Sequence, residues 1–352
     1  MLALIFEKYY NEHNKVKCIG VEGERVFTDK EKYHKVFWTA LILVNISIFI
    51  IFIKVIFTNK DYSLNQKENS YIIGASYMTM NNEFYKIISE EISAKIETEN
   101  DRLIVRDPAL DAKRQNDQIN DMLDMGIDVL IVTPVEWKSL TSVLKKAKEK
   151  NVLIVVVDTN VYEEDFVDCT ITSDNYHAGV IVGKYFLEQC ETAKVVIMTH
   201  ETAKSGQDRV QGFLDTIENQ DGIEIVSQIE CKGQSEIAMP ELQKIIDEGF
   251  YFDNIFCLND LAGVGVVAAL EENHLLNDVG VYGVDASPDS KALIKEGLMK
   301  ASAVQFPSQI GKKVADVIYK LLNEENVEKN ILVPVELITK ENVEEFGIDR
   351  WQ

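Results

Sequence analysis

The sequence contains few of the residues that build metal sites or disulfide frameworks. Its five cysteines are odd in number and show no CxxC spacing, which is typical of small buried side chains rather than of a disulfide-linked scaffold. Its five histidines form neither an HExxH motif nor another closely spaced pair. We therefore expect neither a metal site nor any other cofactor.

Basic residues are also in the minority. The chain has 36 Lys and Arg residues against 58 Asp and Glu residues, its formal net charge is -22, and it has no stripe of basic residues. Such a chain repels phosphate backbones, which excludes nucleic acid as an expected partner. With 352 residues, 46% of them hydrophobic, it is long enough to form two lobes around buried cores.

One long stretch of the chain lacks charge altogether. Residues 36–53 carry no charged side chain, and apolar character resumes after Lys54 as far as Phe57. About 20 apolar residues span a bilayer, and no small-x-small cleavage site follows. We expect an uncleaved membrane anchor at 36–57 rather than a buried helix, with a cytoplasmic tail at 1–35 and a spacer at 58–70. Lysines flank the run on both sides, so charge alone does not fix how a single-pass anchor is oriented. We place the tail inside and the domain that follows the anchor outside, and this orientation rests as much on the expected function as on charge.

From residue 71 onward, apolar runs alternate with segments of helical spacing. The strand-like runs are 71–76, 102–107, 128–134, 152–158, 194–200, 223–229, 254–260, 279–285 and 301–306, and the helical segments include 111–125, 137–150, 176–191 and 261–273. Nearly continuous apolar strands separated by helices are typical of parallel sheets covered on both faces. The sequence therefore predicts an α/β fold.

Polar side chains follow several of these strands, at the edge of a parallel sheet where ligands gather. The residues at this edge are Thr79 to Tyr85, Thr133, Asp158, Thr159, Asn259, Asp260, Asp285 and Gln305, with Arg209 at the opening of a helix. The set contains no nucleophile with an adjacent base. Carboxylates, amides and a guanidinium suit the hydroxyl groups of a sugar, and aromatic rings stack on its C–H faces.

Residues 81–85, Asn-Asn-Glu-Phe-Tyr, have a second interpretation. Asn82 has the side chain of a helix N-cap, and Phe84 and Tyr85 suit ordinary packing at the start of a helix. The sugar hypothesis explains why two rings stand beside polar groups, because a bound ligand would cover them. Both interpretations stay open at this point.

Several of these stretches together resemble a known family. They are Asn81-Asn-Glu-Phe-Tyr85, Val157-Asp-Thr159, Ser173-Asp-Asn175, Arg209-Val-Gln-Gly-Phe213, Leu258-Asn-Asp260, Gly283-Val-Asp285 and Gln305-Phe-Pro-Ser-Gln-Ile-Gly311. From Tyr71 to Phe346 the chain is similar to type I periplasmic sugar-binding proteins, close to the ribose- and xylose-type receptors. The resemblance implies two Rossmann-like lobes joined by a three-stranded hinge. Lobe 1 would be 71–173 plus 306–334, and lobe 2 would be 174–305 plus 335–352.

The resemblance also implies a set of sugar-binding residues. Lobe 1 would contribute Asn82, Phe84, Tyr85 and Asp158, lobe 2 would contribute Arg209, Asn259 and Asp285, and the hinge would contribute Gln305. Thr133 and Thr159 complete the set, although ribose receptors commonly carry Asn and Arg at these two positions.

We expect a membrane-anchored, extracytoplasmic receptor for a monosaccharide, a pentose of the xylose or ribose type. The chain resembles xylose-responsive binding proteins that pair with a sensor histidine kinase, and this partner is the one we expect. Delivery to the permease of a sugar ABC importer is the alternative. A remote alternative is a sugar-acting enzyme with Asp158 and Asp285 as acid and base.

Overall fold

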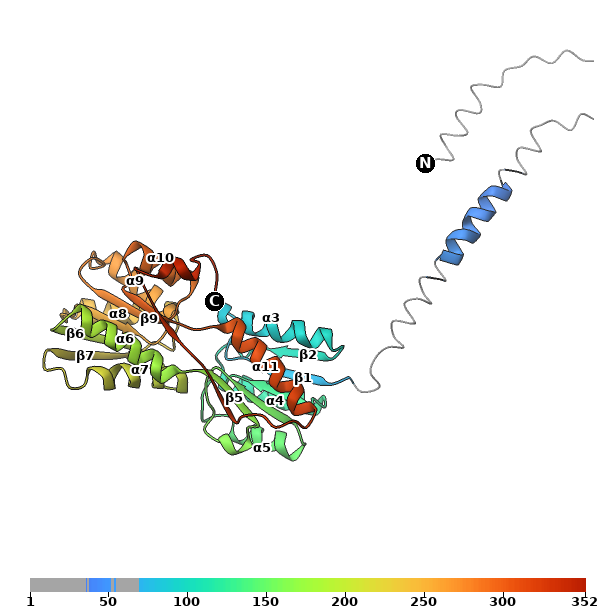
Figure 1. The fold of residues 1–352 in the computed structure, drawn as a ribbon, viewed down its shortest axis with the longest axis horizontal. Helices are drawn as coiled ribbons and strands as arrows, with labels where there is room; N and C mark the ends of the chain where they lie inside the picture. Colours follow the sequence, from blue (N-terminus) through green and yellow to red (C-terminus); the bar gives the residue numbers. More distant parts are fainter. Residues whose placement is uncertain (1–35, 37, 52–53, 55–69) are drawn as a thin grey trace, which may run out of the picture. The chain divides into compact units, whose positions relative to one another are not determined.

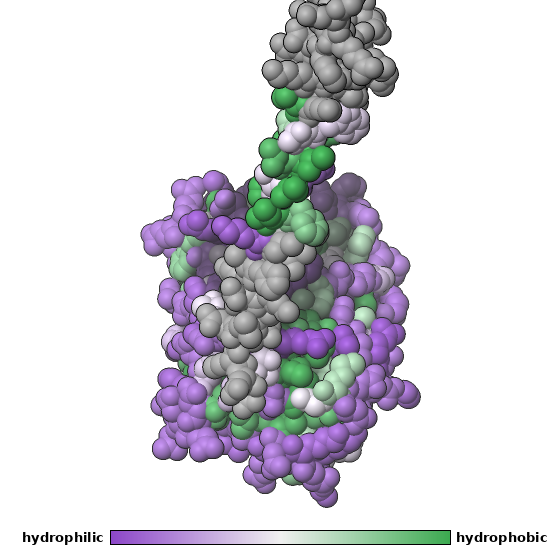
Figure 2. All heavy atoms as spheres, turned by 90° about the vertical axis from the view of Figure 1, so that its right-hand side faces the viewer, coloured by the Kyte–Doolittle hydropathy of each residue, from purple (hydrophilic) through white to green (hydrophobic). Residues whose placement is uncertain are grey.

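The computed structural model describes residues 36, 38–51, 54 and 70–352 (Figure 1). Residues 38–51 are helical, and the exposed side chains of this segment are mostly apolar (Figure 2). Among the described residues, no helix combines the length and the apolar character needed to cross a membrane. The anchor predicted at 36–57 is thus not supported, and part of it lies outside the described residues, as do the predicted tail (1–35) and nearly all of the spacer (58–69).

Residues 70–352 alternate between strands and helices, as the sequence predicts. Before the chain first crosses from lobe 1 to lobe 2, the elements are β1 (Ile72–Ser76), α3 (Glu83–Thr98), β2 (Arg102–Arg106), α4 (Ala112–Asp124), β3 (Val129–Val132), α5 (Thr141–Glu149), β4 (Leu153–Val157), η1 (Glu164–Phe166) and β5 (Cys169–Ser173). They are followed by α6 (Asn175–Gln189), β6 (Ala193–Thr199), α7 (Lys204–Ile217), β7 (Ile223–Glu230), α8 (Ser235–Asp247), β8 (Asn254–Cys257), α9 (Asp260–Glu272), β9 (Gly280–Asp285), α10 (Pro288–Glu296) and β10 (Ala301–Val304). The last elements are α11 (Pro307–Leu322), β11 (Asn330–Val333), β12 (Glu336–Thr339) and η2 (Val343–Phe346).

The strands form two six-stranded sheets, one in each lobe. Lobe 1 has the order β11-β5-β4-β3-β1-β2 and lobe 2 has the order β12-β10-β9-β8-β6-β7. Neighbouring strands run parallel, except that β12 pairs antiparallel with β10. The chain crosses between lobes after β5, after β10 and between β11 and β12. The predicted α/β architecture with two lobes is confirmed.

Alternate residues of each central strand face opposite helical layers. In β3, Val129 and Ile131 belong to the core under α3 and α11, whereas Leu130 and Val132 belong to the core under α4 and α5. A strand buried on both faces must be apolar at every position, which explains the continuous apolar runs. Because the strands are parallel, their carboxyl ends meet at one edge of each sheet, where the two lobes face each other.

Three strands were missed by the sequence analysis: β5, β11 and β12. β5 reads Cys-Thr-Ile-Thr-Ser, and β11 and β12 have four residues each, so none of them is a long apolar run. All three lie beside the crossings between lobes. The predicted helix at 137–150 is also shorter than expected, because it begins only at Thr141.

Candidate functional site

A cavity lies between the two lobes at the carboxyl ends of their strands. Its lining contains eight of the ten predicted residues, namely Asn82, Phe84, Tyr85, Asp158, Arg209, Asn259, Asp285 and Gln305. The other lining residues are Met78, Thr79, His200, Ala203, Ser205, Lys232, Gln234 and Leu258. Both sheets and the hinge therefore contribute side chains to one small polar chamber.

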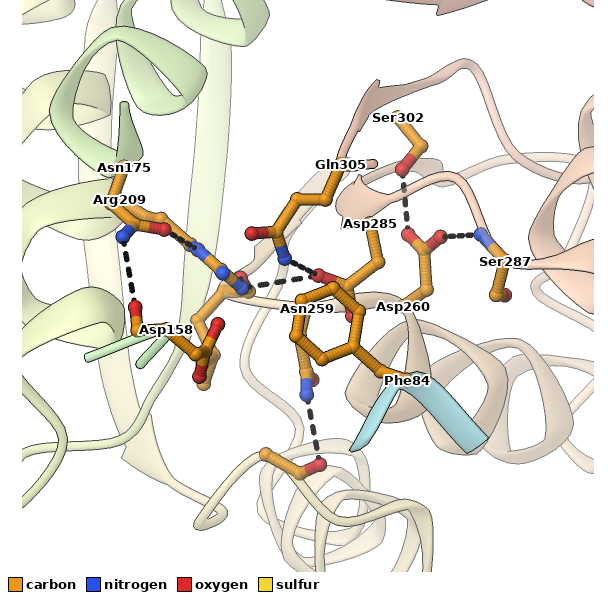
Figure 3. Close-up of polar contacts among 12 residues, drawn as sticks. Phe84, Asp158, Asn175, Arg209, Asn259, Asp260, Asp285, Ser287, Ser302 and Gln305 are labelled. Atoms are coloured by element: carbon orange, nitrogen blue, oxygen red, sulfur yellow. Dashed lines mark hydrogen bonds and ion pairs between the residues drawn. The ribbon is translucent and has the colours of Figure 1, made fainter. Parts of the chain in front are cut away.

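Arg209 lines this chamber and contacts Asn175 and Asp285 (Figure 3). It projects from the second turn of α7 and is only 4% exposed. Its Nε donates to Asn175 Oδ1 at 2.8 Å, and its Nη1 donates to the carbonyl oxygen of Leu258 at 3.1 Å and to Asp285 Oδ1 at 3.2 Å. Three acceptors thus hold the guanidinium plane in a fixed orientation.

Asp285 is the carboxylate of lobe 2, at the end of β9. Its backbone has φ of 126° and that of Ala286 has φ of 52°, values that residues other than glycine rarely adopt. Such strain is concentrated at functional sites, because the surrounding structure must maintain it. Gln305 Nε2 also donates to Asp285 Oδ1, at 2.6 Å. Burial raises the pKa of Asp285 in spite of the opposing attraction of Arg209.

Asp158 is the corresponding carboxylate of lobe 1, directly after β4. Its backbone is also left-handed, with φ of 70°. Tyr85 Oη donates to Asp158 Oδ2 at 2.9 Å, and Asn175 Nδ2 lies 3.5 Å from the Asp158 carbonyl oxygen. Burial raises the pKa of Asp158, with Arg209 acting in the opposite direction. Each lobe therefore presents one buried carboxylate on a strained strand end.

Two asparagines that line the cavity are also helix caps. Asn82 Oδ1 accepts from the N–H of Phe84 at 3.0 Å at the start of α3, and Asn259 Oδ1 accepts from the N–H of Ala262 at 3.0 Å at the start of α9. Asn259 Nδ2 further donates to the Gly233 carbonyl oxygen at 3.1 Å. The capping interpretation of Asn82 is thus confirmed, and the cap places the amide at the cavity wall.

The two rings at 84 and 85 are already buried by the protein. Phe84 is 3% exposed and Tyr85 is 6% exposed. The Phe84 ring packs in edge-to-face geometry with the rings of Tyr85 and Trp351, with ring centroids 5.5 and 5.8 Å apart. The protein itself therefore covers these rings, whereas the sugar hypothesis expected a bound ligand to cover them. Packing at the helix start explains their burial, and both still contribute to the cavity wall.

Thr133 and Thr159 are not among the residues that line the cavity. Thr133 is fully buried beneath the wall, and its carbonyl oxygen accepts from Gln115 Nε2 at 2.9 Å. Thr159 Oγ1 accepts from the N–H of Ser205 at 2.9 Å, in the first turn of α7. The residue before α7, Ala203, has no capping side chain, so Thr159 of lobe 1 caps a helix of lobe 2.

The structure brings to the site several residues that were not predicted from the sequence. His200 ends a predicted strand, and Lys232 and Gln234 follow another, so attention to every strand end could have found them. Asn175 lies in a stretch that carries the family resemblance, but nothing in its spacing signals the bond to Arg209. Burial, with Lys232 and Arg209 nearby, lowers the pKa of His200 to about 4, which keeps the imidazole neutral.

The chamber can form many hydrogen bonds to a small polar ligand. Gln305 is 2% exposed, and its Oε1 is buried without a hydrogen-bond partner among the described residues. A buried acceptor without a donor costs free energy, so a ligand hydroxyl that donates to it would stabilise the site. Arg209, Asn82 and Asn259 supply further polar groups around the same space.

Comparisons with known proteins agree with this geometry. Residues 73–326 match the family described as periplasmic binding protein domain. The ribose import binding protein of Bacillus subtilis (strain 168) is 23% identical over 278 residues, covering 78% of this chain and 89% of that protein. That of Escherichia coli (strain K12) is 24% identical over 265 residues, covering 75% of this chain and 88% of that protein.

Solved structures show the same fold. An ABC transporter solute binding protein from Bacillus halodurans C-125 with bound myo-inositol has a TM-score of 0.75 at 24% identity, covering 81% of this chain and 100% of that chain. One from Actinobacillus succinogenes 130z with bound D-allose has a TM-score of 0.71 at 21% identity, covering 78% and 100%. The family match spans well over half of the chain, and the chain therefore belongs to the periplasmic binding protein domain family, with the type I fold of two lobes.

Proposed function

We propose that this chain binds a monosaccharide between its lobes and serves as the substrate-binding subunit of a sugar ABC importer. The observation that carries the proposal is the buried chamber in which Asp158, Asp285 and Arg209 meet, together with the unpartnered acceptor of Gln305. The names of the two relatives above, both import binding proteins for ribose, support the same function.

Each type of side chain in the site suits a different part of a sugar. Asp158 and Asp285 accept hydrogen bonds from sugar hydroxyls, while Arg209 and the amides donate to them. Phe84 supplies an apolar wall for the C–H face of the ring. Since Arg209 already pairs with Asp285 at 3.2 Å, the centre of the chamber suits an uncharged ligand. A pentose of the ribose or xylose type is the first ligand to test.

Binding without turnover is the expected outcome. In a glycosidase, one carboxylate must be free to attack or to activate water while the other donates a proton. Here Tyr85 occupies an oxygen of Asp158, and Arg209 and Gln305 share an oxygen of Asp285. These bonds favour carboxylates that hold a ligand in place.

Isothermal titration calorimetry of the purified full chain tests the proposal. The titrants are xylose, ribose, allose and myo-inositol, and the sugar is recovered afterwards and analysed for change. We expect saturable binding of at least one titrant, recovered intact. Asp158→Asn keeps the left-handed backbone accessible and should weaken binding about tenfold, because a charged acceptor becomes neutral. Asp165→Asn, a change at an exposed position of η1, is the matched control. Absence of binding to every titrant would overturn the proposal.

The partner is tested separately. The resemblance to xylose-responsive binding proteins favours a sensor histidine kinase, whereas the two relatives described above favour the importer. Affinity purification of the full chain from membranes of its own cells should recover a permease and an ATPase. Recovery of a histidine kinase without them would reverse the order of the two hypotheses.

Fractionation of the same cells tests the hypothesis of an anchor at 36–57, which requires that the chain stay in the membrane after a high-salt wash.

A further inference from the structure

The last six residues, 347–352, form a tail that leaves lobe 2 and ends on lobe 1. The tail follows η2, and Figure 1 shows the C-terminus beside the start of α3. Its base is held by Lys291 of α10, which is fully buried. Lys291 Nζ donates to the carbonyl oxygen of Gly347 at 2.7 Å and to those of Phe346 and Arg350. A buried ammonium with three carbonyl partners fixes the direction in which the tail leaves lobe 2.

Trp351, near the end of this tail, contacts the helix that carries the cavity wall. Its Nε1 donates to Glu83 Oε2 at 3.0 Å, and its ring lies 5.8 Å from the Phe84 ring at an interplanar angle of 63°. Phe84 in turn meets Tyr85 edge-on, and Tyr85 donates to Asp158. One continuous set of contacts therefore leads from the tail to a carboxylate of the site.

We infer that Trp351 is a positioning residue for ligand binding and that the tail is an additional, non-covalent link between the lobes. The three chain crossings connect the lobes covalently, whereas the tail connects them through a ring contact and one hydrogen bond. The indole restricts the Phe84 ring to the orientation in which it forms the cavity wall. The predicted lobe boundaries assign 335–352 to lobe 2, but the side chain of Trp351 packs against the core of lobe 1.

This inference rests on the proposed function, since it concerns the affinity for the same ligand. The contact between two edge-on aromatic rings contributes favourable interaction free energy. We expect its loss to weaken sugar binding about threefold to tenfold. Trp351→Ala in the full chain should therefore lower the affinity by that factor for whichever sugar the wild type binds. Trp351→Phe keeps a ring against Phe84 and should recover most of the affinity, while a purely hydrogen-bonding role would leave it as weak as the alanine variant.

The matched control is Tyr251→Ala, which truncates an aromatic ring that is 68% exposed on lobe 2. The affinity of each variant is measured by calorimetry, and the melting temperature is measured with and without sugar. We expect Trp351→Ala to reduce the shift caused by the sugar and to change the melting temperature without sugar much less. An unchanged affinity in Trp351→Ala, with wild-type binding intact, would overturn the inference and leave the proposed function standing. No binding by the wild type would overturn the proposed function itself.

Tryptophan fluorescence provides a second measurement, one that does not depend on the overall stability of the fold. The chain has three tryptophans, Trp38, Trp137 and Trp351. In a variant with both Trp38→Phe and Trp137→Phe, emission from Trp351 should shift when sugar binds, because the indole contacts Phe84, which lines the cavity. A spectrum unchanged by saturating sugar would contradict the role assigned to the tail.

Discussion

Replacing Arg209 by methionine tests the electrostatic design of the site without any ligand. Methionine fills much of the same volume but removes the guanidinium from Asn175, Leu258 and Asp285. The side chains of Arg209 and Asp285 are 5% and 6% exposed, so bulk water solvates the carboxylate poorly once its partner is lost. Arg209→Met therefore leaves a buried carboxylate without its cation.

Breaking one side of a buried ion pair costs about 3–5 kcal/mol, and we expect about 3 kcal/mol of unfolding free energy at pH 8, because Gln305 still donates to Asp285. The loss should be smaller at pH 5. Burial already raises the pKa of Asp285 in the wild type, and removal of Arg209 raises it further. A folded-state pKa above the unfolded value gives stability at low pH that is lost as the pH rises through the folded pKa. The variant should therefore be relatively more stable in acid.

Urea unfolding followed by circular dichroism at pH 5 and pH 8 measures both effects. Combining Arg209→Met with Asp285→Asn should recover part of the loss at pH 8, because the unpaired charge is gone. Lys204→Met is the matched control, since it removes a cation from the same helix. Its pair with Asp208 is about one-third exposed, so the cost should stay below about 1 kcal/mol. A loss in Arg209→Met that is equal at both pH values, or undiminished by Asp285→Asn, would refute the reasoning.

Three further changes have definite expectations. Tyr85→Phe removes the hydroxyl that donates to Asp158 at 2.9 Å. This change should weaken sugar binding about tenfold, as measured by calorimetry. An unchanged affinity would mean that this hydrogen bond does not orient the carboxylate. Thr159→Val removes the cap that lobe 1 supplies to α7 and should lower affinity about fivefold, since the contact between lobes loses about 1 kcal/mol; Thr159→Ser should restore it. Gly179→Ala places a Cβ 2.0 Å from the Arg209 carbonyl oxygen and should reduce unfolding free energy by about 3 kcal/mol, and a stable variant would show that α6 and α7 can separate.

Many features of this protein could be predicted from local sequence patterns. Continuous apolar runs indicate strands buried on both faces, and the residues after each run lie at the ligand-binding edge of a parallel sheet. This geometry is why the sequence alone could place Asp158, Asn259, Asp285 and Gln305 together. The positive φ of the two aspartates and the missing partner of Gln305 Oε1 are properties of the folded chain alone.

Two of the errors lie where an interaction joins distant parts of the chain. Thr159 follows a strand like its neighbour Asp158, yet its hydroxyl caps a helix of the other lobe. Phe84 is covered by Trp351, a residue 267 positions later in the sequence. Short strands beside the crossings were missed because four or five residues with polar members carry little periodicity.

By itself the sequence determined the alternation of strands and helices, the acidic surface and the chemical types available at the strand ends, because backbone geometry and burial act locally along the chain. Only the tertiary structure decided which of those side chains reach the cavity, which become caps or packing partners, and where the C-terminal tail ends. These outcomes depend on how two lobes meet in space, and residues far apart in the sequence carry no local signal of that meeting.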